Sequence, residues 1–200
     1  MIGSINQSNY ILNRTVAPTD YPVTLDDVKQ NCGVEYNEHD VLLHSLIESA
    51  TSQVEEMLGL YLITQTWTVS IQATENNRLL LPLLPVQSVS ALNYYDTDDA
   101  DQTLTVSDFY LYKSDNWAFL EPKTGTSWPA TTSRLDALTA TVVCGFGNNG
   151  ASVPANIKQA VLMLVAHWYE NRAAKSDIQL YDVPFAVELI ISTARRGWVA

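Results

Sequence analysis

The sequence predicts an α+β fold with a helical core and an inserted small unit of antiparallel strands. Apolar residues near both ends of the chain recur every three to four positions, which indicates the buried face of a helix. In the middle of the chain they alternate with polar residues, which indicates half-buried strands. Because the two patterns occupy separate stretches, we expect a helical core from residues 21–64 and 151–200, a β-unit from residues 65–150 and a flexible arm over residues 1–20.

Two helices are expected before residue 64. The first begins at Thr24, whose hydroxyl can cap it, with Asp27 completing a capping box and Gly33 ending it. The second starts after Asn37 and ends at Gly59, a residue suited to the left-handed conformation that closes helices. We expect helices, and not strands, to form the structural centre. The predicted buried face of the second helix consists of Leu42, Leu43, Leu46, Ile47, Ala50, Val54, Met57 and Leu58.

Strands are expected from Gln65 onward. There Trp67, Val69 and Ile71 alternate with polar residues, and Trp67 is expected to close a small β-core. Clusters of turn-forming residues separate the further expected strands. These are Arg78–Leu81, Val86–Tyr95, Phe109–Tyr112, Ala118–Glu121 and Ala140–Phe146.

Helices return in the last quarter of the chain. One begins at Pro154, a residue favoured in the first turn, and the last runs from near Pro184 to Arg195 and Arg196. A polar break over residues 173–182 offers little to anchor the last helix, so we expect that helix to become ordered on a partner. The predicted buried face of the earlier helix consists of Ile157, Val161, Leu164, Val165 and Trp168.

The composition limits the classes of function. A hydrophobic fraction of 46% excludes a mainly disordered chain, and 200 residues suit one domain or one domain with an insertion. The net charge of −11 argues against a nucleic-acid binder, which needs a basic face for phosphates. Residues 151–200 carry 4 acidic and 5 basic side chains, against 18 and 6 in residues 1–150. We therefore expect a partner with acidic or carbonyl-rich surfaces at the C-terminal quarter.

Cys32 and Cys144 are too few for a disulfide framework, and we expect both to be buried free thiols. The first ten residues have neither the positive start nor the apolar segment of a signal peptide. Apolar runs stay below the roughly 18–20 residues that span a bilayer. We expect no membrane association, and synthesis in a reducing cytoplasm.

A glycine motif is the sharpest sign of chemistry. Residues 145–150 read GFGNNG, the pattern with which dinucleotide-binding proteins bring pyrophosphate to a helix N-terminus. That site also needs a second parallel strand ending in an acidic residue about 20 positions later. Here that position falls inside an expected helix, so we interpret the motif as a glycine-rich turn.

A run of aspartates fits a calcium site poorly. Asp96, Asp98, Asp99 and Asp101 resemble the start of a calcium loop, but the glycine and glutamate of an EF-hand are missing, which favours a solvated hairpin tip. Weak cation binding there stays the alternative.

The histidines do not form a metal set. His39 and His44 are five residues apart on one helix and point about 140° away from each other. His167 lies beside two aromatic residues and is expected in packing or an interface. Since Ser, His and acidic residues form no recognisable catalytic group either, we expect no catalytic residue, metal or cofactor.

Aromatic side chains suggest contact surfaces. Ten Tyr and five Trp exceed four Phe, and Tyr and Trp combine apolar area with a polar group, which suits interfaces. We expect Tyr94, Tyr95, Tyr110 and Tyr112 at contacts between subunits, with burial in the β-core as the alternative.

Four segments carry a family resemblance. They read YPVTLDDVKQ at residues 21–30, LITQTWTVSI at residues 62–71, LVAHWYENR at residues 164–172 and VPFAVELII at residues 183–191. In this order and spacing they resemble the head–tail connector proteins of tailed bacteriophages, also called adaptor or head-completion proteins. The resemblance spans residues 21–196.

The resemblance implies a structural protein of the virion neck, made in the bacterial host cytoplasm. It implies a homo-oligomeric ring of twelve copies that docks on the portal protein, contacts the next neck or tail protein and lets DNA pass without specific binding. Portal contact is expected from Phe185, Arg195, Arg196 and Trp198. The alternatives are a nucleotide-binding enzyme, based on the glycine motif alone, and a generic protein-binding module.

Overall fold

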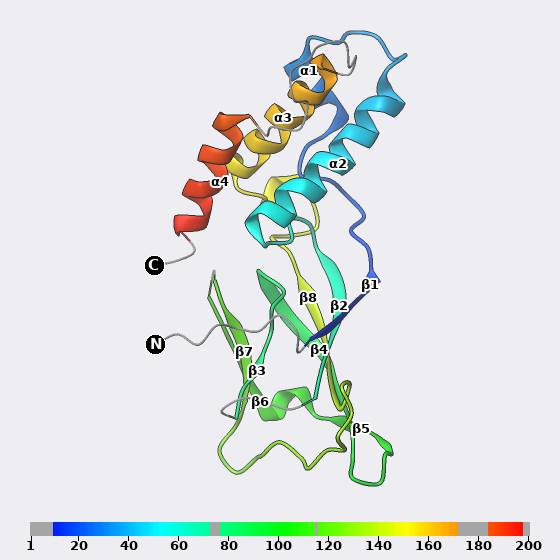
Figure 1. The fold of residues 1–200 in the computed structure, drawn as a ribbon, viewed down its shortest axis with the longest axis vertical. Helices are drawn as coiled ribbons and strands as arrows, with labels where there is room; N and C mark the ends of the chain where they lie inside the picture. Colours follow the sequence, from blue (N-terminus) through cyan, green and yellow to red (C-terminus); the bar gives the residue numbers. More distant parts are fainter. Residues whose placement is uncertain (1–9, 73–76, 115, 172–183, 198–200) are drawn as a thin grey trace. The chain divides into compact units, whose positions relative to one another are not determined.

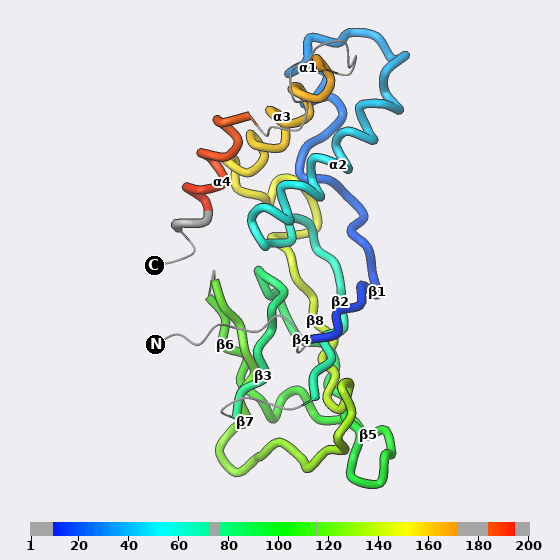
Figure 2. The backbone as a smooth tube through the Cα atoms, in the orientation of Figure 1, coloured from blue at the N-terminus to red at the C-terminus, as the bar shows by residue number. Residues whose placement is uncertain are grey.

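The computed structural model describes residues 10–72, 77–114, 116–171 and 184–197, with side chains in the last segment up to Ala194. It divides into two compact units. The strand unit comprises residues 1–17 and 65–145, and the helical unit comprises residues 18–64 and 146–200. Figure 1 shows the helices and antiparallel sheets, which confirm the α+β fold. After β1 the chain passes through the helical unit, returns to the strand unit at β2 and leaves it after β8 (Figure 2).

The described residues of the strand unit form two sheets, and the pairings between their strands are antiparallel. The first has five strands in the order β1-β2-β8-β4-β5, and the second has three in the order β3-β7-β6. The strands are β1 (Ile11–Val16), β2 (Gln65–Ile71), β3 (Leu79–Leu80), β4 (Val86–Tyr95), β5 (Asp101–Leu104), β6 (Phe109–Lys113), β7 (Ala118–Pro122) and β8 (Leu138–Cys144). The predicted strands therefore lie within two residues of the observed ones, whereas β1 and β5 were not expected.

Strand β1 corrects the prediction of a flexible arm over residues 1–20. It pairs with β2, and Ile11 lies opposite Ser70 and Arg14 opposite Trp67. All six side chains of β1 are exposed, so no alternation of buried residues marks the strand in the sequence. Residues 1–9 lie outside the described part of the chain.

The strand unit has its own core, which corrects the expectation that helices alone form the structural centre. Trp67, expected to close that core, is only half-buried, and its Nε1 atom donates to Oε1 of Gln65 at 3.1 Å. The guanidinium of Arg14 lies 5.9 Å from the centroid of the Trp67 ring. Fully buried aliphatic side chains fill the unit instead: Leu79, Leu83, Leu92, Leu120 and Val142.

In the helical unit, α1 (Leu25–Cys32) is formed as the sequence predicts. The hydroxyl of Thr24 accepts from the backbone N–H of Asp27 at 3.1 Å, and the carboxylate of Asp27 accepts from the backbone N–H of Thr24 at 2.9 Å. Gly33 ends the helix at a φ of 65°, in the left-handed region. Cys32 is half-buried, so the expectation of a buried thiol holds only for Cys144.

Helix α2 (Asp40–Leu58) has the predicted limits but a narrower buried face. Gly59 closes it at a φ of 69°. Leu42 is exposed and Leu46 is half-buried, because the buried line runs one position later along the helix. That line consists of Leu43, Ile47, Ala50, Thr51, Val54 and Leu58.

Helix α3 (Ala155–Glu170) contacts α1, α2 and the last helix, α4 (Phe185–Gly197). Its predicted buried face is confirmed except at Trp168, which is half-buried. Tyr169 is buried instead, and its hydroxyl lies 2.7 Å from Nδ1 of His39 at the start of α2. This bond joins two helices that are far apart in the sequence.

Helix α4 packs within the helical unit. Among its described side chains Val187, Ile191 and Ala194 are buried, and the helix contacts both α2 and α3. This corrects the expectation that the last helix becomes ordered only on a partner. The polar break over residues 173–182 lies outside the described residues.

The glycine motif after β8 is a tight turn, as expected. The carbonyl of Gly147 accepts from the N–H of Thr64 at 2.9 Å. A Cβ atom added at Gly147 would lie only 2.5 Å from the Cβ atom of Ser152. A Cβ atom at Gly150 would lie 2.5 Å from the carbonyl oxygen of Pro22. These glycines therefore allow close contact between segments of this chain.

The buried line of α2 predicts the effect of two neighbouring substitutions. Ile47→Ala should lower the free energy of unfolding by about 2–5 kcal/mol, because Ile47 is only 1% exposed and the change leaves a cavity. Leu46→Ala should cost clearly less, because Leu46 is half-buried. Urea denaturation of both variants measures the difference. An equal loss in the two variants would contradict the observed orientation of α2.

The glycine turn predicts a rescue. Gly147→Ala should destabilise the protein through its clash with the Ser152 side chain, and Ser152→Gly in the same chain should restore most of the lost stability. Gly150→Ala is the matched control, because it meets backbone atoms of Pro22 and Ser152→Gly should not rescue it. Thermal unfolding of the single and double variants tests this. Equal destabilisation of Gly147→Ala with and without Ser152→Gly would refute the packing.

Candidate interaction surfaces

The three histidines lie apart in different environments. His39 bonds to Tyr169, His44 is exposed, and Nδ1 of His167 lies 3.3 Å from Nδ2 of Asn171. No group of three or more His, Cys, Asp or Glu side chains in the described ranges is arranged to hold a metal ion. Helices within those ranges are also too short or too polar to cross a membrane.

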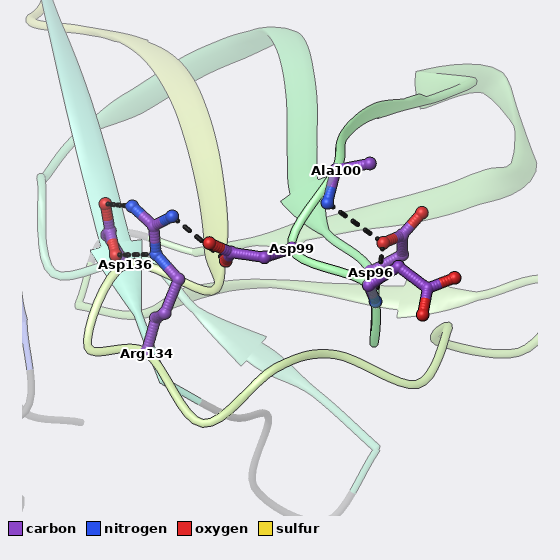
Figure 3. A network of polar contacts seen from close by, with 6 residues as sticks. Asp96, Asp99, Ala100, Arg134 and Asp136 are labelled. Carbon is purple, nitrogen blue, oxygen red and sulfur yellow. Dashed lines mark hydrogen bonds and ion pairs between the residues drawn. The ribbon is translucent and has the colours of Figure 1, made fainter.

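The aspartate run forms a hairpin tip between β4 and β5, as predicted. The carboxylate of Asp96 accepts from the backbone N–H of Asp98 and of Ala100, each at 3.0 Å, and from Nε2 of Gln102 at 3.0 Å. These bonds, led by that from Ala100, lower the pKa of Asp96 below its usual value. Figure 3 shows Asp96 turned toward Ala100. One carboxylate thus fixes the backbone of the whole tip.

Arg134 braces the same hairpin from the loop before β8. Its guanidinium donates to both carboxylate oxygens of Asp136, at 2.9 and 3.0 Å, and to Asp99 at 3.1 Å (Figure 3). It also lies 3.7 Å from the centroid of the Tyr95 ring. The pKa of Arg134 is raised and that of Asp136 lowered by their shared hydrogen bonds.

The four tyrosines expected at subunit contacts lie on two different sheets. Tyr94 and Tyr95 are half-buried in β4 of the five-stranded sheet. Tyr110 and Tyr112 are exposed on β6 of the three-stranded sheet, and their ring centroids are 5.9 Å apart. The structure therefore brings Tyr110 and Tyr112 together, whereas the ring of Tyr95 lies against the guanidinium of Arg134.

Two aromatic residues that sequence reasoning missed extend the second pair. Phe119 in β7 lies 5.2 Å from Tyr112, and Trp117 stacks on Phe119 at 5.3 Å, measured between ring centroids. The signal was the alternation along β7, where Phe119 stands between the buried Ala118 and Leu120.

The residues expected to contact the portal lie at the end of the chain. Phe185 and Leu189 are 78% and 56% exposed on α4. A pocket is lined by Met57 of α2 and by Glu188, Ile191 and Ser192 of α4. Arg195 and Arg196 belong to α4, but their side chains, like Trp198, lie outside the described residues.

The hairpin predicts a dependence on pH. Because folding lowers the pKa of Asp96 below 3.8, its contribution to stability is present above that pH and is lost as the pH falls through the folded pKa. Asp96→Asn should therefore destabilise the protein at neutral pH, and the difference from wild type should shrink in acid. Thermal unfolding between neutral and acidic pH measures this, with Asp98→Asn as control. A difference that persists unchanged in acid would contradict the account.

The comparisons with known proteins concern the family and the fold. The chain matches the family model described as "Head completion protein" over residues 23–180. A chain in "Virion of native gene transfer agent (GTA) particle" has a TM-score of 0.76 and 20% identity, with 92% of this chain and 95% of that chain covered. A chain in "Neck of native GTA particle computed with C12 symmetry" has a TM-score of 0.74 and 22% identity, and the match covers 92% of this chain and 94% of that chain.

A chain in "Neck of empty GTA particle computed with C6 symmetry" has a TM-score of 0.75 and 20% identity, with 92% and 95% covered. At these identities the likeness shows a common fold. Curated protein sequences give no match. The family model covers most of the chain, and three of the four segments that carry the resemblance overlap it. This chain belongs to the head completion protein family.

Proposed function

We propose that the protein is a structural component of the neck of a tailed phage or phage-like particle. The family match over residues 23–180 carries this proposal. The fold shared with chains from gene transfer agent necks supports it. In this role the protein docks on the portal, joins head to tail, and is found in the virion after synthesis in the host cytoplasm.

The protein forms a ring of twelve copies. One similar chain comes from a neck computed with C12 symmetry and another from a neck computed with C6 symmetry. The two are compatible, because a ring with twelvefold symmetry also obeys sixfold symmetry. Neighbouring copies meet through Tyr94, Tyr95, Tyr110 and Tyr112, and a further neck or tail protein binds below the ring.

The ring continues the DNA channel without binding DNA specifically. A net charge of −11 repels phosphates and lets the genome slide. The role needs contact surfaces and no catalysis. In the motif that resembles a nucleotide site, Gly147 and Gly150 leave the space that Ser152 and Pro22 occupy, which favours a structural role over an enzyme.

Portal contact is assigned to Phe185, Arg195, Arg196 and Trp198. Phe185 is 78% exposed while its helix is anchored by buried residues, so an apolar side chain is presented on a fixed support. The two arginines, at the negative end of α4, can donate charge-assisted hydrogen bonds to carboxylates or carbonyls.

This assignment predicts the behaviour of surface variants. Phe185→Ser combined with Leu189→Ser, or Arg195→Glu combined with Arg196→Glu, should weaken binding to the purified portal by more than about tenfold. Val41→Ser is the control, because Val41 is 85% exposed on α2. Co-sedimentation with the portal measures binding. Full binding by both variants would move the contact away from α4, and failure of the wild-type protein to bind any portal would favour a generic protein-binding module.

A further inference from the structure

The three-stranded sheet has an outer face that is aromatic. Along β6 and β7, Phe109 and Leu120 point inward and are buried, whereas Tyr110, Tyr112 and Phe119 alternate with them. Tyr110 and Tyr112 are 48% and 43% exposed, and the nearby Trp117 is 46% exposed. Outer faces of antiparallel sheets are usually polar, so contiguous exposed rings indicate a surface that another molecule covers.

Two cations lie over these rings. The guanidinium of Arg78 is 4.5 Å from the Phe119 centroid and 3.2 Å from the carboxylate of Glu121. The ammonium of Lys123 is 5.1 Å from the Tyr110 centroid and has no carboxylate partner among the residues that the structure describes. Together, the residues Arg78, Tyr110, Tyr112, Trp117, Phe119 and Lys123 are named the aromatic–cation face.

The hairpin tip between β4 and β5 carries negative charges that complement the positive charges of the aromatic–cation face. The carboxylate of Asp96 accepts hydrogen bonds from backbone N–H groups of the tip, and that of Asp99 accepts one from Arg134. Asp98 and Asp101 are exposed, and within the described part of the chain their carboxylates have no cationic partner. Figure 1 shows β5 and β6 on opposite sides of the strand unit.

A closed ring of more than two copies needs two different patches that fit each other, because each copy contacts its neighbours head to tail. The strand unit carries such a pair on opposite sides, and the hairpin tip is held rigid by its own bonds, which lowers the entropy lost on docking. A single-stranded nucleic acid would also suit aromatic rings and cations. The net charge of −11 favours a protein partner over that alternative.

We propose that the hairpin tip of one copy docks on the aromatic–cation face of the next copy. Asp98 and Asp101 then meet Lys123, and the tip covers the exposed rings of Tyr110 and Tyr112. This inference rests on the proposed ring and names the two surfaces that close it.

Charge reversal tests the contact in the full chain. Lys123→Glu should weaken self-association by more than about tenfold, and so should Asp98→Lys combined with Asp101→Lys, because like charges then face each other. An equal mixture of the two variants should assemble, since a ring of alternating copies pairs each reversed patch with its opposite. Lys113→Glu is the matched control, because the ammonium of Lys113 bonds to the carbonyl of Gln87, away from the face.

Sedimentation velocity over a range of concentrations measures assembly, and copies bound per purified portal measure it if the ring forms only there. Assembly of either reversed variant at the wild-type level, or no recovery in the mixture of two folded variants, would overturn the contact while leaving the ring itself in place. Binding of a thymidine oligonucleotide that Lys123→Glu abolishes would assign the face to nucleic acid. A wild-type chain that neither assembles nor binds portal would instead overturn the proposed function.

Discussion

The pairing of β2 with β8 is the constraint on which the rest of the structure depends. The two strands run antiparallel in unbroken register from Gln65 opposite Cys144 to Ile71 opposite Leu138. Just beyond this register both segments pass into the helical unit, where the backbone N–H of Thr64 donates to the carbonyl of Gly147. The pairing therefore brings together two segments that are far apart in sequence. Without it, α2 and α3 would have to find each other across the whole inserted unit, at the cost of a long loop closure.

Each unit has its own packed core. In the helical unit α3 contacts α1, α2 and α4, so burial of its apolar face holds these helices at once. In the strand unit, aliphatic side chains fill the interior while aspartates, an arginine and tyrosines organise the surface. Arg134 is an example of a surface residue of this kind, because it pairs with Asp136 and Asp99 and covers the ring of Tyr95 without entering the core. This arrangement, in which contact surfaces stand on independently packed supports, suits the proposed role in a neck.

Local signals made much of the fold predictable. The two limits of α1 and the end of α2 follow from Thr24, Gly33 and Gly59, whose roles depend only on adjacent backbone. Strand β1 could not be predicted, because its side chains are all exposed and its partner β2 lies far along the chain. The buried face of α2 was predicted too wide, since helical periodicity does not say which of two adjacent leucines meets another element.

The candidate surfaces were predictable only in part. Aromatic content pointed to Tyr110 and Tyr112, but their grouping with Trp117 and Phe119 depends on the register of β6 with β7. The central proposal is that twelve copies form a ring on the portal. Imaging the neck of the intact particle without imposed symmetry tests it most directly. The account predicts twelve copies of this fold between portal and tail, and a neck without this chain, or with another number of copies, would contradict it.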